Sequence, residues 1–443
     1  MKPPQSSHPT KAWGSEDAER HLRSLELFGM RFGLDRMRRM MTALGSPERR
    51  FQSIHVVGTN GKSSTTRMIA AILERHGLRT GTYTSPHLIS YTERVQVGER
   101  DVDGDAFAAA ISRAAWAAEH VNHTLEGDDH VTQFELLTAA ALWAMAEQAV
   151  EVVVVEAGLG GRYDATSVID SRVTVLTNVG LEHTRWLGPT LTDIAEEKLA
   201  VVRPHTALVL GESLAAPALA VAERVAGERE VPIVRPRAGT SSRTELLARG
   251  SFQRRNFELA RAAAEAYLQT RGIPLSEGAV AQAAAATEVR GRLQLLKDDP
   301  PTVLDGAHNP DAVAALVESL PDVLDVSPAP LALVLGVLDD KDAAGMLAAL
   351  MPLVARAWFT APPSSRALSP AALQSLARQL GFEATASEPQ PARALAQARS
   401  WADEHGGAVL ATGSVYLVGE LLSQIERSDG VALQAPARGN SIR

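Results

Sequence analysis

The fold is decided by the segment HVVGTNGKSSTTRMIAAILERHGLRTGTYTSPHL, residues 55–88. It opens as a short β-branched run, turns through a glycine-containing loop and continues with a helical pattern. The apolar residues of that pattern share one helical face: Met68, Ile69, Ile72 and Leu73. A strand, a Gly-Lys-Ser loop and a helix in this order are typical of a phosphate-binding loop. Gly58, however, lies only three residues before Gly61, closer than in the standard version of such a loop.

The loop at 58–64 carries the groups that a bound phosphate needs. Its glycines let the backbone turn tightly and point N–H groups at phosphate oxygens, and the helix N-terminus adds its dipole. Lys62 is expected to reach the outer phosphates, and a hydroxyl of Ser63 or Ser64 to lie near phosphate or a metal. The predicted nucleotide-binding residues are Gly58, Thr59, Asn60, Gly61, Lys62, Ser63 and Ser64. The alternative is a glycine turn without a ligand, and the strand–loop–helix context argues against it.

Short β-branched runs alternate with longer helical patterns in the rest of the chain. The runs at 53–58, 151–158, 172–180 and 206–211 are almost continuously apolar, as in parallel strands buried on both faces. A second set lies at 302–310, 331–337, 356–363 and 408–414. The alternation predicts an α/β fold with two domains, at 1–292 and 293–427. Residues 297–301 are expected to form a linker or hairpin tip, and 428–443 a disordered tail.

The composition excludes several classes of protein. A chain of 443 residues is too long for one ordinary hydrophobic core, and its 45 % apolar and 22 % charged residues are normal for a globular protein. A net charge of −8 disfavours nucleic acid and anionic membranes as partners. The absence of cysteine excludes disulfides, thiolate metal sites and a cysteine nucleophile. Without an apolar signal region or a run of about 18 apolar residues, a cytoplasmic location is expected.

Polar residues follow several of the predicted strands, at the end of a parallel sheet where ligands bind. Ser85 lies in TSPHL, Glu156 ends the valine-rich strand, and His183 follows the next strand. Together these side chains could hold Mg²⁺. Imidazole is an unusual Mg²⁺ ligand, so His183 could equally be a capped loop histidine. Lys198 lies on a helical pattern and, taken alone, is a solvated lysine.

A second polar cluster lies in the smaller domain. Asp305 and His308 follow a predicted strand in LDGAHNPDA, which suggests ligand contact. A turn capped by its own side chains is the alternative. Asn256 and Arg292 lie near the domain junction and carry no information alone.

Taken together, these segments resemble the folylpolyglutamate synthase/dihydrofolate synthase family of the Mur ligase superfamily. The matching segments are FGLDRM (32–37), VVGTNGKSSTTRMI (56–69), YTSPHLISYTERVQV (83–97), TQFELLTAAAL (132–142), VEAGLGGRYDATSVI (155–169), TNVGLEHTRWLGPTLTDIAEEK (177–198), LDGAHNPDA (304–312), GVLDDKD (336–342) and TGSVYLVGEL (412–421). They cover nearly the whole chain in the family's order. The segments TSPHL and GLGGRYDAT separate the folate branch from the cell-wall branch.

The resemblance implies an N-terminal Mur-ligase-type P-loop ATPase domain with a smaller, Rossmann-like C-terminal domain. It also implies an ATP- and Mg²⁺-dependent ligase that uses L-glutamate and dihydropteroate or a reduced folate. The folate carboxylate would attack the γ-phosphate of ATP and become an acyl phosphate. The amino group of glutamate would then displace phosphate. Catalysis of this kind is mostly alignment and neutralisation of charge.

The resemblance also implies roles for individual residues. Ser85, Glu156 and His183 match Mg²⁺ ligands, which favours the ligand role for His183. Lys198 matches a lysine that the family carbamylates, so that it can bind a second Mg²⁺. The implied catalytic residues are Lys62, His183 and Lys198. The implied ATP contacts outside the loop are Asn256, Arg292, Asp305 and His308. The implied substrate contacts are Phe134, Glu135, Arg162, Tyr163 and Asp164.

Two departures from the family pattern bear on these roles. Ser63 stands where the family often has glycine, which leaves open whether Ser63 or Ser64 meets phosphate or metal. LAVV follows Lys198 where the family commonly has Ala-Gly-Ile. A cell-wall Mur ligase and a non-catalytic nucleotide-binding protein are the alternative functions. We expect a monomer that makes dihydrofolate and also lengthens the glutamate tail.

Overall fold

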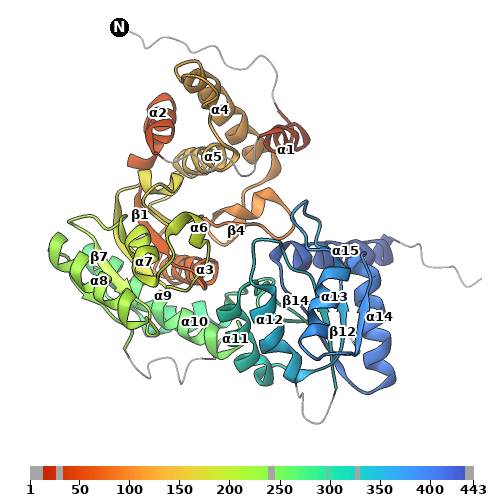
Figure 1. Ribbon diagram of the computed structural model, residues 1–443. Coiled ribbons are helices and arrows are strands. Elements are labelled where there is room, and N and C mark those ends of the chain that lie inside the picture. The colour runs from red at the N-terminus through yellow and green to blue at the C-terminus, as the bar shows by residue number, and fades with distance from the viewer. Residues whose placement is uncertain (1–12, 26–32, 238–244, 297–298, 325–329, 435–443) are drawn as a thin grey trace, which may run out of the picture. The chain divides into compact units, whose positions relative to one another are not determined.

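The computed structural model describes residues 13–25, 33–237, 245–296, 299–324 and 330–434, the last seven of them by their backbone alone (Figure 1). These residues form two compact units. The first contains the described residues up to Leu247 together with Gln253–Glu288. The second contains Ala248–Phe252 and the described residues from Val289 onward.

The first unit is built on an eight-stranded sheet with the order β4-β3-β2-β5-β1-β6-β7-β8. Its strands are β1 (Gln52–Val57), β2 (Thr80–Tyr83), β3 (Val95–Val97), β4 (Arg100–Asp101), β5 (Val152–Glu156), β6 (Ser171–Leu176), β7 (Ala207–Leu210) and β8 (Ile233–Val234). The pairs from β2 to β8 are parallel, and β3 and β4 join the β2 edge in antiparallel pairs. The chain leaves β1 towards β2 on one side and later leaves β5 towards β6 on the other. The carboxyl ends of β1, β5 and β6 therefore meet at a topological switch point, where α/β sheets bind ligands.

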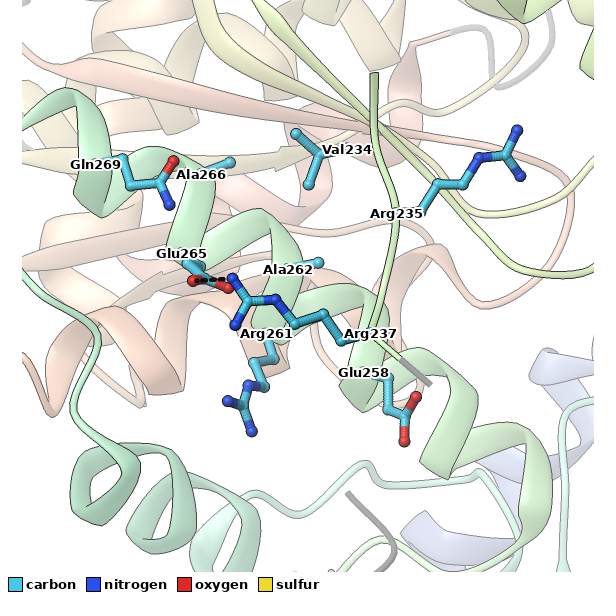
Figure 2. Close-up of a pocket in the computed structure, with 9 residues that line it drawn as sticks. All are labelled: Val234, Arg235, Arg237, Glu258, Arg261, Ala262, Glu265, Ala266 and Gln269. Atoms are coloured by element: carbon cyan, nitrogen blue, oxygen red, sulfur yellow. Dashed lines mark hydrogen bonds and ion pairs between the residues drawn. The ribbon is translucent and has the colours of Figure 1, made fainter. Parts of the chain in front are cut away.

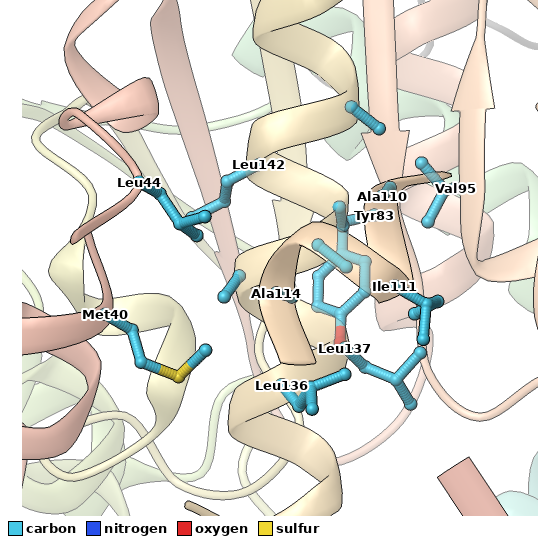
Figure 3. Packing of buried hydrophobic residues seen from close by; sticks show 14 of the residues in the cluster. Met40, Leu44, Tyr83, Val95, Ala110, Ile111, Ala114, Leu136, Leu137 and Leu142 are labelled. Carbon is cyan, nitrogen blue, oxygen red and sulfur yellow. The ribbon is translucent and has the colours of Figure 1, made fainter. Parts of the chain in front are cut away.

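Helices enclose this sheet. They are α1 (Ser15–Ser24), α2 (Asp35–Ala43), α3 (Lys62–Glu74), α4 (Gly104–Asn122), α5 (Gln133–Glu147), α6 (Thr184–Leu187), α7 (Leu191–Leu199), α8 (Ala216–Arg229), α9 (Ser251–Thr270) and α10 (Glu277–Ala286). Helix α3 packs against β1, β2 and β5. Val153 and Val155, on β5, belong to a hydrophobic cluster with residues of α4 and α5, and Figure 3 shows part of this cluster. Alternate residues of a strand face opposite sides, and both faces of β5 are buried, so its first four residues are all valine, as the sequence predicts.

The second unit is built on a six-stranded sheet with the order β13-β12-β11-β14-β10-β9. Its strands are β9 (Gln294–Leu296), β10 (Thr302–Leu304), β11 (Leu331–Leu335), β12 (Val354–Phe359), β13 (Thr385–Ser387) and β14 (Ala408–Thr412). All pairs are parallel except β9 with β10. Its helices are α11 (Pro310–Ser319), α12 (Ala343–Leu350), α13 (Pro370–Gln379), α14 (Pro391–Glu404) and α15 (Val415–Gln434). A core of leucine, valine and alanine side chains, with Met346 and Phe359, fills this unit.

The eight strands predicted from apolar runs are all present. The short strands β2, β3, β4, β8, β9 and β13 were not predicted, because they contain no apolar run. Strand β2 has the sequence TGTY, and its Gly81 lies so close to α5 that a Cβ would be 3.1 Å from Met145 Sδ. A short strand of this kind owes its place to neighbouring strands rather than to its own pattern.

The ends of the domains differ from the expected ones. Val289–Arg292 were expected in the first domain and belong to the second unit. The reason is local, since Gly306 N donates to Gly291 O at 2.9 Å and ties this segment to the second sheet. Helix α15 continues to Gln434, into the expected tail, because no proline interrupts its backbone ladder. Residues 435–443 lie outside the described ones.

The segment expected as a linker or hairpin tip joins β9 to β10. These strands form an antiparallel pair. Residues 297–298 of the segment lie outside the described residues. Within the described parts of the chain, no helix is both long and apolar enough to cross a bilayer.

Candidate active site

The loop between β1 and α3 can only be built from glycine at two positions. Gly58 has φ +150°, and a Cβ there would lie 1.9 Å from Thr177 Oγ1. Gly61 has φ +80°, and a Cβ there would lie 2.5 Å from Asn256 Oδ1. Glycine is therefore required both for the left-handed backbone and for the close approach of two other segments. Asn256, from α9, is thereby placed against the phosphate-loop residues within the first unit.

The segment that follows β6 holds the loop by hydrogen bonds. Thr59 N donates to Asn178 O at 3.0 Å, and Asn60 N donates to Asn178 Oδ1 at 2.8 Å. Thr177 Oγ1 donates to Asn60 O at 2.7 Å. Gly180 N donates to Thr59 Oγ1 at 3.0 Å. The sequence did not identify Thr177 and Asn178 as loop partners, because more than a hundred residues separate them from the loop. The polar TN pair at the end of an apolar strand is the one signal that could have suggested them.

The carboxylate of Glu156 links the phosphate loop to the TSPHL segment. Glu156 is 2 % exposed at the carboxyl end of β5. Its Oε1 accepts a hydrogen bond from Ser63 Oγ at 2.9 Å, and its Oε2 accepts one from Ser85 N at 3.0 Å. Ser64 is buried, with 2 % of its surface exposed. Of the two hydroxyls that the sequence left open, that of Ser63 is therefore the one directed at Glu156.

Two lysines lie against the backbone of the same loop. Lys62 Nζ donates to Thr59 O at 2.8 Å. Lys198, on α7 and only 4 % exposed, donates from Nζ to Gly58 O at 2.7 Å. The interpretation of Lys198 as a solvated helix lysine is thus wrong, because α7 presents it to the buried face of the loop.

Burial, and then the nearby charge of Lys62, lower the pKa of Lys198 to about 7, although Glu182 and Asp164 oppose the shift. A large fraction of this amine is therefore neutral and nucleophilic near neutral pH, which an exposed lysine is not.

His183 follows the segment that holds the phosphate loop. It has a left-handed backbone with φ +54°, precedes α6 and leaves a third of its side chain exposed. Its Nε2 lies 3.9 Å from Glu182 Oε1. Among the described residues, no three His, Asp or Glu side chains gather as a metal cluster. The predicted Mg²⁺ ligands include two such side chains, Glu156 and His183, together with Ser85 and Lys198. The carboxylate of Glu156 and the hydroxyl of Ser63 beside it provide oxygen atoms, the ligand type that Mg²⁺ prefers.

The predicted substrate residues lie on α5 and on the loop after β5. Phe134 packs against this loop, since a Cβ on Gly158 would lie 2.5 Å from its ring. Asp164 is 6 % exposed, and its Oδ2 accepts a hydrogen bond from Leu159 N at 2.7 Å. Burial raises the pKa of Asp164, and hydrogen bonds from Thr166 and Leu159 oppose this rise.

Three other predicted substrate residues have partners or exposure that bear on their role. Arg36 Nε donates to both carboxylate oxygens of Glu135, to Oε1 at 3.0 Å and to Oε2 at 3.1 Å. Glu135 also belongs to the capping box at the N-terminus of α5. Arg162 Nε donates to Glu197 Oε1 at 2.8 Å. Tyr163 is 48 % exposed. Glu135 is thus engaged in a buried ion pair, and its substrate role stays a prediction.

Three of the four predicted ATP contacts outside the loop lie in the second unit. Asp305 is 3 % exposed; Oδ2 accepts from Leu293 N and Oδ1 from Ala307 N, both at 2.7 Å. Arg292 lies against this turn, because a Cβ on Gly306 would be 2.1 Å from Arg292 Nη1. His308 Nδ1 lies 2.9 Å from Gly306 O. The second unit therefore gathers Arg292, Asp305 and His308 around one turn, while Asn256 belongs to the first unit.

A pocket shown in Figure 2 lies between the β8 region and α9 and contains none of these residues. Its charged side chains are paired: Arg237 with Glu265 at 3.2 Å, Arg261 with Glu277 at 2.6 Å and Arg235 with Glu223 at 3.6 Å. In Figure 2, Arg235 and Arg261 point in different directions rather than at a common centre. The described residues that line this pocket therefore do not direct their charged groups at one ligand position.

Comparison with known proteins agrees with this geometry. Residues 56–213 match the Mur ligase middle domain, and residues 291–415 match the Mur ligase glutamate ligase domain. The chain is 32 % identical over 443 residues to the dihydrofolate synthase/folylpolyglutamate synthase of Escherichia coli, covering 96 % of this chain and 98 % of that protein. The chain belongs to the folylpolyglutamate synthase/dihydrofolate synthase family. As a member of this family it is an ATP-dependent glutamate ligase.

Solved structures of family members resemble both units. Mycobacterium tuberculosis folylpolyglutamate synthase complexed with ADP has a TM-score of 0.85 and 30 % identity, covering 93 % of this chain and 98 % of that one. Escherichia coli FolC in complex with DHPP and ADP has a TM-score of 0.81 and 28 % identity, covering 95 % and 100 %. The Yersinia pestis bifunctional enzyme complexed with AMPPNP and Mn ion has a TM-score of 0.79 and 28 % identity, again covering 95 % and 100 %. The predicted fold, a Mur-ligase-type ATPase domain followed by a smaller α/β domain, is confirmed.

The crowding at Gly61 gives a prediction for this family member. Gly61→Ala is expected to weaken ADP binding by more than about tenfold, or about 1.4 kcal/mol, because the new Cβ would lie 2.5 Å from Asn256 Oδ1, so that either the Asn256 side chain or the loop must shift. Isothermal titration calorimetry measures the affinity.

Gly77→Ala is the matched control. Gly77 lies just beyond the other end of α3 with φ +81°, and no atom lies within 4 Å of its added Cβ. Both variants carry similar backbone strain, so only Gly61→Ala should lose affinity. Equal ADP affinities for the two variants would contradict the close packing as the cause.

Proposed function

We propose that this protein joins L-glutamate to the carboxylate of dihydropteroate and of folyl(poly)glutamates. Two relatives support the choice of acceptor: the Escherichia coli relative is a dihydrofolate synthase/folylpolyglutamate synthase, and a related structure contains DHPP and ADP. The observation that carries the proposal is the link of Glu156 to both Ser63 and Ser85. This link couples the phosphate loop to a segment that distinguishes the folate branch. Neither a cell-wall ligase nor a non-catalytic nucleotide-binding protein has comparable support among these relatives.

In the proposed reaction, the protein first aligns the acceptor carboxylate with ATP. An oxygen of that carboxylate bonds to the γ-phosphorus, and the bond to ADP breaks. The amino nitrogen of glutamate then bonds to the acyl carbon, phosphate leaves, and the nitrogen loses a proton. Lys62 and the loop N–H groups are proposed to bind the triphosphate and to compensate its charge.

The proposed Mg²⁺ ligands are Ser85, Glu156 and His183, with Lys198 as a ligand once it is carbamylated. Mg²⁺ would supply positive charge next to the phosphates when bound. The donor set around Glu156 supports this assignment, as does the related structure complexed with AMPPNP and Mn ion. Asn256, Arg292, Asp305 and His308 are proposed to contact ATP. Phe134, Glu135, Arg162, Tyr163 and Asp164 are proposed to contact the pterin-bearing substrate. A monomeric state and a cytoplasmic location stay predictions from the sequence.

The proposed function is tested by assaying the purified protein with ATP, Mg²⁺ and glutamate. Dihydropteroate and tetrahydrofolate are supplied in parallel reactions, and ADP release and product masses are measured. We expect both acceptors to gain glutamate and ADP release to require glutamate and acceptor together. If neither acceptor supports glutamate-dependent ADP release, the proposed function is wrong. If only one does, the bifunctional assignment fails.

Glu156→Gln is expected to lower turnover by about two orders of magnitude or more, because it removes the negative charge from the proposed metal set while retaining the side-chain shape. Steady-state ADP release measures the effect, and a thermal melt shows that the variant is folded. Glu151→Gln, at an exposed residue immediately before the same strand, is the control and should retain wild-type turnover. Wild-type turnover by Glu156→Gln would refute the metal assignment.

The carbamylation of Lys198 predicts a dependence on dissolved CO₂. The neutral amine of Lys198 would bond to the carbon of CO₂ and lose a proton, which converts a neutral group into an anion. Activity of the wild-type protein is therefore expected to fall in CO₂-depleted buffer and to return with bicarbonate, whereas Lys198→Ala stays inactive in both. If Lys198→Ala is fully active at low and at high CO₂, carbamylation has no functional role.

A further inference from the structure

A buried chain of hydrogen bonds connects the central strand β1 to the loop that carries Asp164. His55, on β1 and 1 % exposed, has Nε2 2.9 Å from Thr166 Oγ1. Thr166 Oγ1 donates in turn to Asp164 Oδ1, and Thr166 N donates to the same oxygen at 3.0 Å. Thr166 is itself fully buried. The chain His55–Thr166–Asp164 therefore lies entirely inside the first unit.

The direction of each hydrogen bond in this chain follows from its chemistry. A hydroxyl has one proton, and in Thr166 that proton is donated to Asp164. Thr166 Oγ1 must then accept from His55, so His55 is the tautomer with its proton on Nε2. Burial, and then the charge of Arg203, lowers the pKa of His55 to about 3, so the imidazole is neutral. A neutral donor can sit in the middle of a sheet without the cost of a buried charge.

The chain constrains the carboxylate that we propose to meet the pterin. One oxygen of Asp164 accepts from Thr166 twice, and the other accepts from Leu159 N. The loop itself has little room to shift, because a Cβ on Gly161 would lie 2.6 Å from Lys198 O. The orientation of the Asp164 carboxylate is thus determined by hydrogen-bond donors on its own loop. One of these donors, the hydroxyl of Thr166, in turn contacts His55 on β1.

We propose that Thr166 and His55 are positioning residues, which orient Asp164 for hydrogen bonding to the pterin-bearing substrate. The inference rests on the proposed function, since it assigns the role of a side chain that acts on the acceptor. Neither residue contacts the substrate in this proposal. Their effect reaches it through the orientation of the Asp164 carboxylate. His55 lies on β1, three residues before Gly58, so the strand that leads into the phosphate loop also contacts the loop that carries Asp164.

The inference is tested by replacing the hydroxyl of Thr166 while keeping its shape. Thr166→Val is expected to raise the KM for tetrahydrofolate and for dihydropteroate by about tenfold or more, since a buried acceptor loses its donor. The KM for ATP should change by less than about twofold. Thr166→Ser retains the hydroxyl and is expected to restore the acceptor KM to near the wild-type value.

Thr174→Val is the matched control. Thr174 is also fully buried and is the β6 partner of His55 in the sheet, but its hydroxyl lies 3.2 Å from Ser171 Oγ. It should leave the acceptor KM unchanged, and thermal melts show that each variant is folded. An unchanged acceptor KM in Thr166→Val overturns the inference. Equal impairment of Thr166→Val and Thr166→Ser does so too, because side-chain shape would then be the cause.

Nitrogen-15 spectra of the histidine side chains give a second readout that does not depend on activity. The signals of His55 are assigned by their absence from the spectrum of His55→Gln. They should show a protonated Nε2 and an unprotonated Nδ1, and a proton on Nδ1 instead would overturn the chain. If the wild-type protein uses neither acceptor, the proposed function fails as well. If the wild-type protein uses at least one acceptor, and Thr166→Val has the same KM for that acceptor as the wild type, the positioning inference alone fails.

Discussion

The backbone of the loop Gly58–Gly61 meets three segments that are distant in sequence, and the rest of the site depends on this contact. Thr177 leaves no room for a side chain at Gly58, and Asn256 leaves none at Gly61. Lys198 Nζ donates to the carbonyl of Gly58. These contacts hold the loop that leads into α3, so they also orient the N-terminus of the helix. The backbone N–H groups there are available to bind a phosphate.

The position of α3 in turn places Ser63 within hydrogen-bonding distance of Glu156, which also accepts from Ser85 N. A carboxylate after four valines is costly to bury unless donors surround it, and these two donors stabilise it in place. Lys198 is the opposite case, a cation with a single backbone acceptor. Its burial favours the neutral amine, the form that can react with CO₂.

The long strands and the domain order could be predicted because buried parallel strands are apolar throughout, as in the valines of β5. The short strands could not be predicted, because TGTY in β2 has its place through β5 and β3. Ser85, Glu156 and the phosphate loop were identified from residue type at strand ends. Thr177, Asn178 and the chain from His55 to Asp164 were not, because a threonine or a histidine in an apolar strand looks like any other buried polar residue. Lys198 shows the limit most clearly, since a lysine in DIAEEKLAVV has the pattern of a solvated helix and lies buried under the loop.

By itself the sequence determined the class of chemistry. Glycine, lysine and hydroxyl residues stand together at one strand-to-helix junction, as phosphate binding requires, and the family's motifs follow in order. It also determined the two-domain α/β architecture through the period of its apolar runs. Only the tertiary structure decided that Ser63 rather than Ser64 faces Glu156, that Glu135 is engaged with Arg36, and that Asp164 is supported from β1. The physical reason is that a hydrogen bond depends on atoms within about 3 Å of each other. Sequence spacing gives such proximity only within one turn of helix or along one strand, and these partners lie on different elements.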